Sequence, residues 1–218
     1  MVATRPWEPA APPPPPTLPG FGHINRYWDR VHEIHAAKIL PGEYYVTTGG
    51  EMISTVLGSC VAACIRDPLL GVGGMNHFLL PLRGRVGPLD PNDPFDVATR
   101  YGNHAMESLI NAVIALGGRR ERMEVKLFGG GSVIPGMTSD VGKKNVQFAE
   151  EYLHNEGLRV LARDVLGPYP RKVQYFPESG RARCKKLYQL QNRTVQQRED
   201  RLAETLQKEG VHGEVDLF

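Results

Sequence analysis

Residues 60–77 read Cys60-Val-Ala-Ala-Cys-Ile-Arg-Asp-Pro-Leu-Leu-Gly-Val-Gly-Gly-Met-Asn-His77, and this stretch sets the first expectation about the fold. Two runs of small and apolar residues flank a segment that begins with Asp67-Pro68, a step that favours a turn. The pattern predicts two antiparallel strands joined by the four-residue loop 67–70. That register places Cys60 opposite His77, with Cβ atoms about 4.5 to 5.5 Å apart. A slip of one residue would move sulfur and imidazole to opposite faces, so the pairing depends on this loop length.

The predicted Cys60 and His77 pair is suited to nucleophilic catalysis. A neighbouring imidazole favours the thiolate, which is the reactive form of cysteine. Gly58 and Ser59 precede the cysteine, and backbone N–H groups at such a turn can bind the oxyanion that forms when an amide carbonyl is attacked. Thr55 lies just upstream, where its hydroxyl can orient the imidazole as the third member of a triad.

Two other interpretations of these cysteines stay open. Cysteine is among the most buried residue types, so Cys60 can equally be a small apolar core residue, and Cys64 and Cys184 are assigned to packing. A zinc site made of Cys60, Cys64 and His77 lacks the tight knuckle of common zinc motifs and has no evident fourth ligand. We therefore expect no metal and no cofactor.

The rest of the chain predicts further strands and helices around this hairpin. A second hairpin is expected over 43–57, with Gly49-Gly50 as its turn, and residues 26–39 suit a short amphipathic helix or a docked extension. The glycine run 129–131 lacks the Gly-Lys-Ser/Thr ending of a phosphate loop, so we expect a tight backbone bend there. The remaining expected elements are helices over 98–116 and 141–156, strands over 124–128, 160–165, 172–176 and 182–187, and a surface loop over 83–94.

These elements indicate an α+β protein with a mixed or antiparallel β-sheet core and flanking helices. The expected organisation of the 218 residues is a disordered Pro-rich arm (1–22), one catalytic domain (23–188) and a polar, solvated, partly helical tail (189–218). The terminal residues 215–218 form a small apolar endpoint.

Composition narrows the setting of the protein. Three cysteines are too few for a disulfide framework, and there is no secretory signal or apolar run of membrane-spanning length, so the cytoplasm is expected. A net charge of +2 does not single out nucleic acid as a partner.

Several motifs together resemble the CheD family of chemoreceptor glutamine deamidases. The motifs are Ser54-Thr-Val-Leu-Gly-Ser-Cys60-Val-Ala-Ala-Cys, Gly73-Gly-Met-Asn-His77-Phe-Leu-Leu-Pro81, Arg100-Tyr-Gly-Asn-His-Ala-Met106, Phe128-Gly-Gly130, Gly142-Lys-Lys-Asn145 and Arg171-Lys-Val-Gln-Tyr-Phe-Pro-Glu-Ser-Gly180. They span roughly residues 42–188 in the order found in the family.

The resemblance implies a domain related to Cys/His toxin deamidases, with Cys60, His77 and Thr55 in the catalytic positions. Ser59, Gly58 and Asn76 are further candidates for binding the oxyanion or positioning the substrate. It also implies hydrolysis of receptor glutamines to glutamate through a thioester, with methyl-accepting chemotaxis receptors as protein substrates. A CheC-type phosphatase is the implied partner, membrane contact would come only through receptors, and a monomer is expected. The alternative is a non-catalytic regulator that binds the phosphatase or the receptors.

Overall fold

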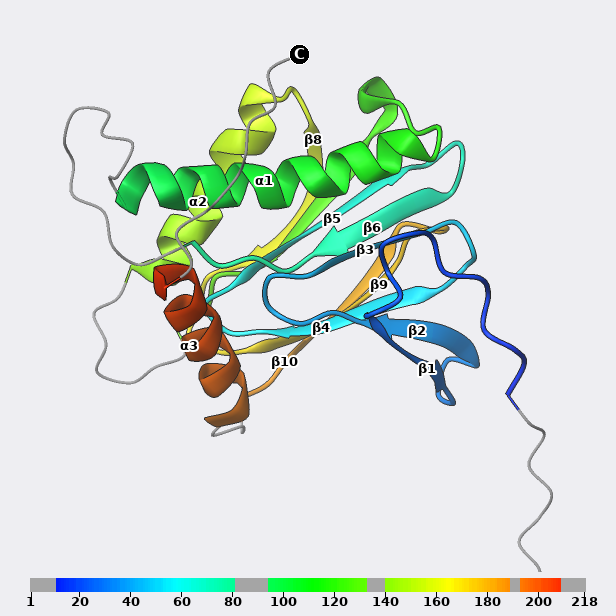
Figure 1. Ribbon diagram of the computed structural model, residues 1–218, viewed down its shortest axis with the longest axis horizontal. Helices are drawn as coiled ribbons and strands as arrows, with labels where there is room; N and C mark the ends of the chain where they lie inside the picture. Colours follow the sequence, from blue (N-terminus) through cyan, green and yellow to red (C-terminus); the bar gives the residue numbers. More distant parts are fainter. Residues whose placement is uncertain (1–10, 81–93, 133–139, 189–192, 209–218) are drawn as a thin grey trace, which may run out of the picture.

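Two five-stranded sheets and three α-helices make up the part of the chain that the structure describes (Figure 1). The computed structural model describes residues 11–80, 94–132, 140–188 and 193–208. Sheet A has the order β1 (Asn25–Asp29), β2 (Ile34–Lys38), β4 (Met52–Leu57), β9 (Arg171–Phe176) and β10 (Arg181–Lys186). Sheet B has the order β3 (Tyr44–Thr47), β6 (Val72–Asn76), β5 (Val61–Asp67), β7 (Glu124–Gly129) and β8 (Arg159–Val165). Each sheet contains one parallel pair, β2 with β4 and β7 with β8, so both sheets are mixed and the α+β prediction is confirmed.

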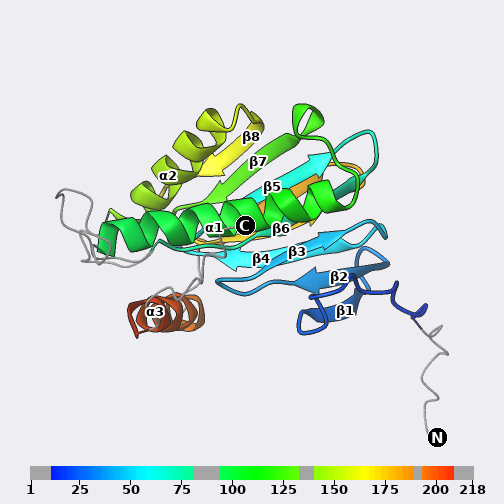
Figure 2. The ribbon, with the colours of Figure 1, turned by 45° about the horizontal axis from the view of Figure 1, so that its top comes forward.

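Helices α1 (Pro94–Ala115) and α2 (Val141–Asn155) lie on one face of sheet B, and sheet A packs on its other face (Figures 1 and 2). The third helix, α3 (Arg193–Lys208), lies apart from α1 and α2 at one end of the sheets (Figure 2). Sheet B is therefore covered on both faces, which explains why β5 and β6 consist almost entirely of buried residues.

The hairpin of residues 60–77 exists, but its predicted register is wrong by two residues. Cys64 pairs with Met75 and Asp67 with Val72, and an isolated bridge joins Val61 to Phe78. The loop is 68–71 because Asp67 still belongs to β5 and starts the turn, accepting from the backbone N–H of Leu69 through Oδ1 and from that of Gly71 through its carbonyl. An even shift keeps every side chain on its face, so Cys60 and His77 still share a side of the sheet.

The hairpin expected over residues 43–57 is wrong. β3 pairs with β6 in sheet B, whereas β4 lies between β2 and β9 in sheet A. Buried Glu51 stabilises the crossing between sheets, because its carboxylate accepts hydrogen bonds from Tyr45 Oη (2.7 Å), Thr47 Oγ1 (2.9 Å) and Arg26 Nε (2.7 Å). Two strands that are neighbours in sequence thus lie in different sheets, and the buried Glu51 links the segment between them to β3.

The N-terminal expectations also need correction. Residues 26–39 form the antiparallel pair β1 and β2, with no helix. Residues 11–22 of the expected disordered arm lie against the domain: Phe21 is buried, Arg26 Nη2 donates to the carbonyl of Pro15 (2.6 Å), and a ring nitrogen of His35 lies 2.9 Å from that of Pro12. Residues 1–10 lie outside the described residues.

Most other predicted elements are confirmed within one or two residues, including α2, β7, β8, β9 and β10. The helix expected from residue 98 begins at Pro94. The surface loop predicted over 83–94 falls almost wholly, and the apolar endpoint 215–218 wholly, outside the described residues. The tail contains the expected helix, α3, but that helix is not simply solvated, because Glu199 is buried.

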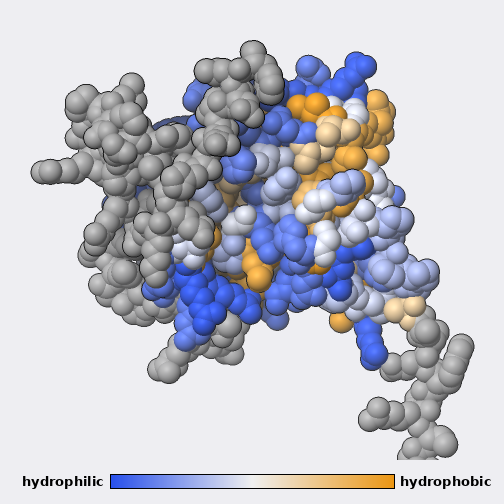
Figure 3. Space-filling model, in the orientation of Figure 1, coloured by the Kyte–Doolittle hydropathy of each residue, from blue (hydrophilic) through white to orange (hydrophobic). Residues whose placement is uncertain are grey.

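The surface over α3 is strongly hydrophilic, whereas apolar surface gathers toward the opposite end of α1 in the same view (Figure 3). Among the helices that the structure describes, none combines the length and the apolar character needed to cross a membrane.

Candidate active site

The loop 58–60 between β4 and β5 is fixed by the glycine run that follows β7. The N–H of Gly130 donates to the carbonyl of Cys60 (2.7 Å), and the N–H of Gly131 donates to that of Gly58 (2.7 Å). A Cβ on Gly129, which has a φ of +111°, would lie 2.2 Å from the carbonyl oxygen of Cys60. The tight bend predicted for the run is confirmed, and only glycine allows the two segments to lie this close.

Buried Asn145 on α2 holds the same loop from the other side. Its Nδ2 donates to the carbonyl of Ser59 (2.9 Å), and its Oδ1 accepts from the N–H of Leu80 (2.8 Å). The side chain therefore ties the segment before Cys60 to the segment after His77.

Thr55 on β4 determines which nitrogen of His77 carries a proton. Its Oγ1 donates to the carbonyl of Ile39 (2.9 Å) and also lies 2.8 Å from Nδ1 of His77. A hydroxyl has a single proton, so with that proton on Ile39 it accepts the second bond from an Nδ1–H. Nε2 is then the unprotonated nitrogen, and it is buried without a hydrogen-bond partner among the described residues. The ring thus offers a lone pair that the fold does not use.

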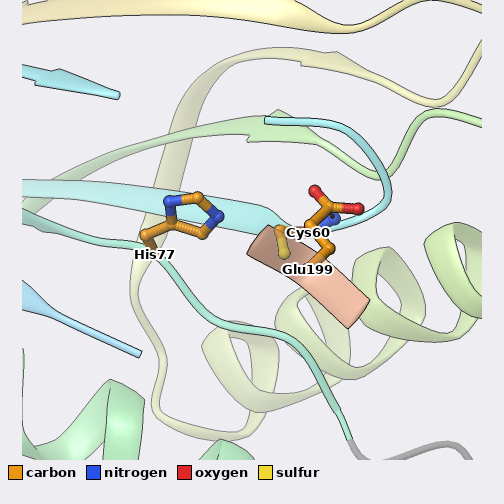
Figure 4. Close-up of side chains that lie close together, drawn as sticks. All are labelled: Cys60, His77 and Glu199. Atoms are coloured by element: carbon orange, nitrogen blue, oxygen red, sulfur yellow. Dashed lines mark hydrogen bonds between the residues drawn. The ribbon is translucent and has the colours of Figure 1, made fainter. Parts of the chain in front are cut away.

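Cys60, His77 and Glu199 converge on one point. The sulfur, a ring nitrogen and a carboxylate oxygen all lie within 4.8 Å of one another, and Figure 4 shows the imidazole extending toward the cysteine while Glu199 enters from α3. Cys60 and His77 are fully buried here, and Glu199 retains only 5% of its exposure. Chain segments more than 120 residues apart in sequence therefore build one cluster.

The Glu199 carboxylate is bound by a set of converging donors. Oε1 accepts from the N–H groups of Gly58 (2.7 Å) and Cys60 (3.2 Å), and Oε2 accepts from the N–H (2.9 Å) and Oγ (2.7 Å) of Ser59. Several hydrogen-bond donors directed at the oxygens of one group form the arrangement that stabilises an oxyanion. The predicted oxyanion candidates Gly58 and Ser59 thus lie at the site, with the N–H of Cys60 as a third backbone donor.

Burial keeps both central side chains neutral in this arrangement. It raises the pKa of the Cys60 thiol well above its ordinary value, and the negative charge and hydrogen bond of Glu199 raise it further. Burial lowers the pKa of His77 to about 4, against the opposing effect of the Glu199 charge. A neutral imidazole beside a neutral thiol can act as a base only as the thiol attacks.

The same three side chains offer sulfur, nitrogen and oxygen ligands to a metal ion. Both oxygens of Glu199 are already taken by four donors, however, so a metal would have to compete with these bonds. The zinc set considered from sequence included Cys64, which lies inside β5 and is fully buried. The donor pattern suits a carboxylate or carboxamide better than a cation.

Asn76 is held by structural hydrogen bonds, and Asn145 and Glu199 are not among the site residues predicted from sequence. The amide of Asn76 accepts from the N–H of Ala63 (2.8 Å) and donates to the carbonyl of Ala105 (3.0 Å), so it joins β5, β6 and α1. In the sequence, Asn145 stands out only as the last residue of the motif Gly142-Lys-Lys-Asn145. Glu199 lies in a segment interpreted as solvated tail, and no local pattern marks it.

The chain as a whole is similar to known proteins. The family model described as CheD chemotactic sensory transduction matches residues 79–186. A Halorhodospira halophila protein named probable chemoreceptor glutamine deamidase CheD is 64% identical over 94% of each chain. A protein of the same name from Hahella chejuensis is 50% identical over 94% of this chain and 96% of its own. Another from Methylobacillus flagellatus is 50% identical over 89% of this chain and 95% of its own. The crystal structure of Neisseria meningitidis protein NMB0706 is 10% identical with a TM-score of 0.34, covering 57% of this chain and 53% of that one.

Proposed function

The chain belongs to the CheD family of chemoreceptor glutamine deamidases, and from this premise we propose that Cys60 and His77 hydrolyse receptor glutamines to glutamate. The activity is that of an amidohydrolase acting on protein glutamine in chemotaxis. The proposal assigns the nucleophile to Cys60, the base to His77 and the orientation of the base to Thr55.

The geometry supports a two-step reaction. Nε2 of His77 takes the thiol proton as the sulfur of Cys60 attacks the side-chain carbonyl carbon of glutamine. The carbonyl oxygen becomes an oxyanion bound by the N–H groups of Gly58, Ser59 and Cys60. His77 then gives the proton to the leaving nitrogen, ammonia departs, and a thioester remains. Water, deprotonated by Nε2, hydrolyses the thioester to a carboxylate and restores the thiol.

One observation carries this proposal: an unpartnered Nε2, a sulfur and three backbone donors are directed to one point that already holds a carboxylate. A purely structural cysteine would need none of these donors. The bond from Nδ1 to Thr55 supports a base with a fixed tautomer.

The test compares wild type with Cys60→Ala and, as a matched control, Cys64→Ala, which alters another buried cysteine, on the adjoining strand β5. After incubation with a receptor cytoplasmic fragment, wild type and Cys64→Ala should add about one mass unit for each deamidated glutamine, whereas Cys60→Ala should add none. Release of ammonia without backbone cleavage distinguishes this activity from a protease. Full activity in a folded Cys60→Ala variant would refute the assignment.

The same proposal includes the protein substrates, the binding partner, the oligomeric state and the location of the protein. Methyl-accepting chemotaxis receptors are the substrates, a CheC-type phosphatase is a binding partner, and the protein acts as a cytoplasmic monomer that approaches the membrane only through receptors. The family resemblance supports these points. The alternative of a non-catalytic regulator predicts that Cys60→Ala behaves like wild type in receptor deamidation and in the cell.

A further inference from the structure

Helix α3 contributes the buried side chain of Glu199 to the site. Glu199 is buried, whereas the adjacent Arg198 and Asp200 are exposed. One turn further on, Leu202 is half-buried, with Cδ1 3.3 Å from the position that a Cβ on Gly42 would take. Among the α3 side chains that the structure describes, Glu199 makes an acidic contact with the domain and Leu202 an apolar one, and the outer surface of the helix is hydrophilic (Figure 3).

The chemistry of Glu199 matches the product of the proposed reaction. Hydrolysis of a glutamine side chain gives a glutamate side chain of the same length, differing by an oxygen in place of the amide nitrogen. The carboxylate of Glu199 lies within 4.8 Å of both Cys60 Sγ and a ring nitrogen of His77 while its oxygens accept from the loop 58–60. It therefore occupies the position in which a product carboxylate would be held.

The Glu199 carboxylate can lie this close to the loop 58–60 because residue 58 is glycine and has no side chain. A Cβ on Gly58 would lie 2.9 Å from each oxygen of Glu199. With α3 in place, the cavity beside Thr55, His77 and Glu199 measures about 10 Å³, roughly the room for one water molecule. This cavity is too small for a substrate side chain while α3 is docked.

We propose that α3 is an intramolecular competitive inhibitor whose Glu199 occupies the binding position of the substrate carboxamide, and that receptor glutamine must displace it. This inference rests on the proposed function, because the bound carboxylate is read as a product. The docked arrangement also shows that an α-helix can present a side chain of glutamine length to these donors. A tethered ligand typically has an effective concentration in the millimolar range, so occupancy by α3 raises the apparent KM without changing the chemical step.

The first experiment measures deamidation of a receptor fragment by the full chain, comparing Glu199→Ala with Glu204→Ala. Glu204 is exposed on the same helix and serves as the matched control. Glu199→Ala should lower KM by about 10-fold with kcat unchanged, because only the competitor is removed. Glu204→Ala should match wild type. A KM for Glu199→Ala equal to that of Glu204→Ala would overturn the proposal.

The second experiment converts the inhibitor into a substrate. In Glu199→Gln the side chain carries a carboxamide at the proposed binding position, so Cys60 should convert it to glutamate, with release of ammonia and a gain of about one mass unit. The gain should be absent in Glu199→Gln with Cys60→Ala, and in Glu204→Gln. If a Glu199→Gln variant that deamidates receptor keeps its own introduced carboxamide intact, the placement is overturned.

The two proposals fail in different ways. If wild type does not deamidate the receptor fragment, the proposed function is wrong. If wild type deamidates it but the Glu199 variants behave like their Glu204 controls, only the inhibitory role of α3 is wrong.

Discussion

Replacing Thr55 with valine tests whether the hydroxyl positions His77. Valine keeps the shape of threonine but removes one donor and one acceptor. At this position, 2% exposed, the change leaves the carbonyl of Ile39 and the Nδ1–H of His77 without their partner. A buried group that loses its partner costs about 1 to 3 kcal/mol, so the two together should reduce the free energy of unfolding by about 2 to 6 kcal/mol.

The effect on catalysis follows from the tautomer. Without an acceptor, the buried Nδ1–H costs about 2 kcal/mol, so the form with a free Nε2 becomes less stable than the other tautomer by about that amount. We therefore expect kcat/KM for receptor deamidation to fall by about 30-fold. The rate of iodoacetamide reaction at Cys60, located by peptide mass mapping in a Glu199→Ala background, should fall in parallel because it depends on the same base.

Thr55→Ser is the control, since it restores the hydroxyl without the methyl group. It should recover kcat/KM to within about 3-fold of wild type, although it removes buried methyl packing worth about 1 kcal/mol of stability. If folded Thr55→Val keeps kcat/KM within a factor of about two, the hydroxyl does not set the tautomer and the reasoning is refuted.

Two further predictions concern the loop and the buried imidazole. Gly129→Ala should displace the Cys60 carbonyl, lower deamidase activity by about 10-fold or more and reduce the free energy of unfolding by about 2 kcal/mol or more. The control Gly157→Ala, at a φ of +66° with open space around it, should cost only about 1 kcal/mol of stability and leave activity unchanged. Equal losses of activity and of urea stability in the two variants would contradict this. Because the pKa of buried His77 is lowered to about 4, the unfolded state binds its proton first as the pH falls below about 6.5, so stability should decline from there toward about pH 4. Between pH 7.5 and pH 5, the free energy of unfolding measured in urea should fall by about 2 kcal/mol more in wild type than in His77→Gln. Identical decreases in the two proteins would count against a lowered pKa of His77.

The core of the site could be predicted from local sequence because it depends on short spans. Turn chemistry at Asp67-Pro68 and alternation in the flanking strands were enough to place Cys60 and His77 on one side of a hairpin, even though the register was two residues off. Gly129 could be recognised as a bend because glycine alone tolerates that conformation. The same local reasoning failed for residues 43–57, where the turn signal joined two strands that pair in different sheets.

The sequence by itself determined the α+β class, the nucleophile and base candidates and the family, because these follow from local periodicity and from motifs kept in order along the chain. Only the tertiary structure decided the assignment of strands to two sheets, the use of Asn145 as an anchor and the position of Glu199 at the donors of loop 58–60. The contact between Glu199 and loop 58–60 joins residues about 140 positions apart, so it depends on how the buried surfaces of the whole domain pack together. The sequence periodicity within α3 does not indicate which of its charged side chains contacts that loop.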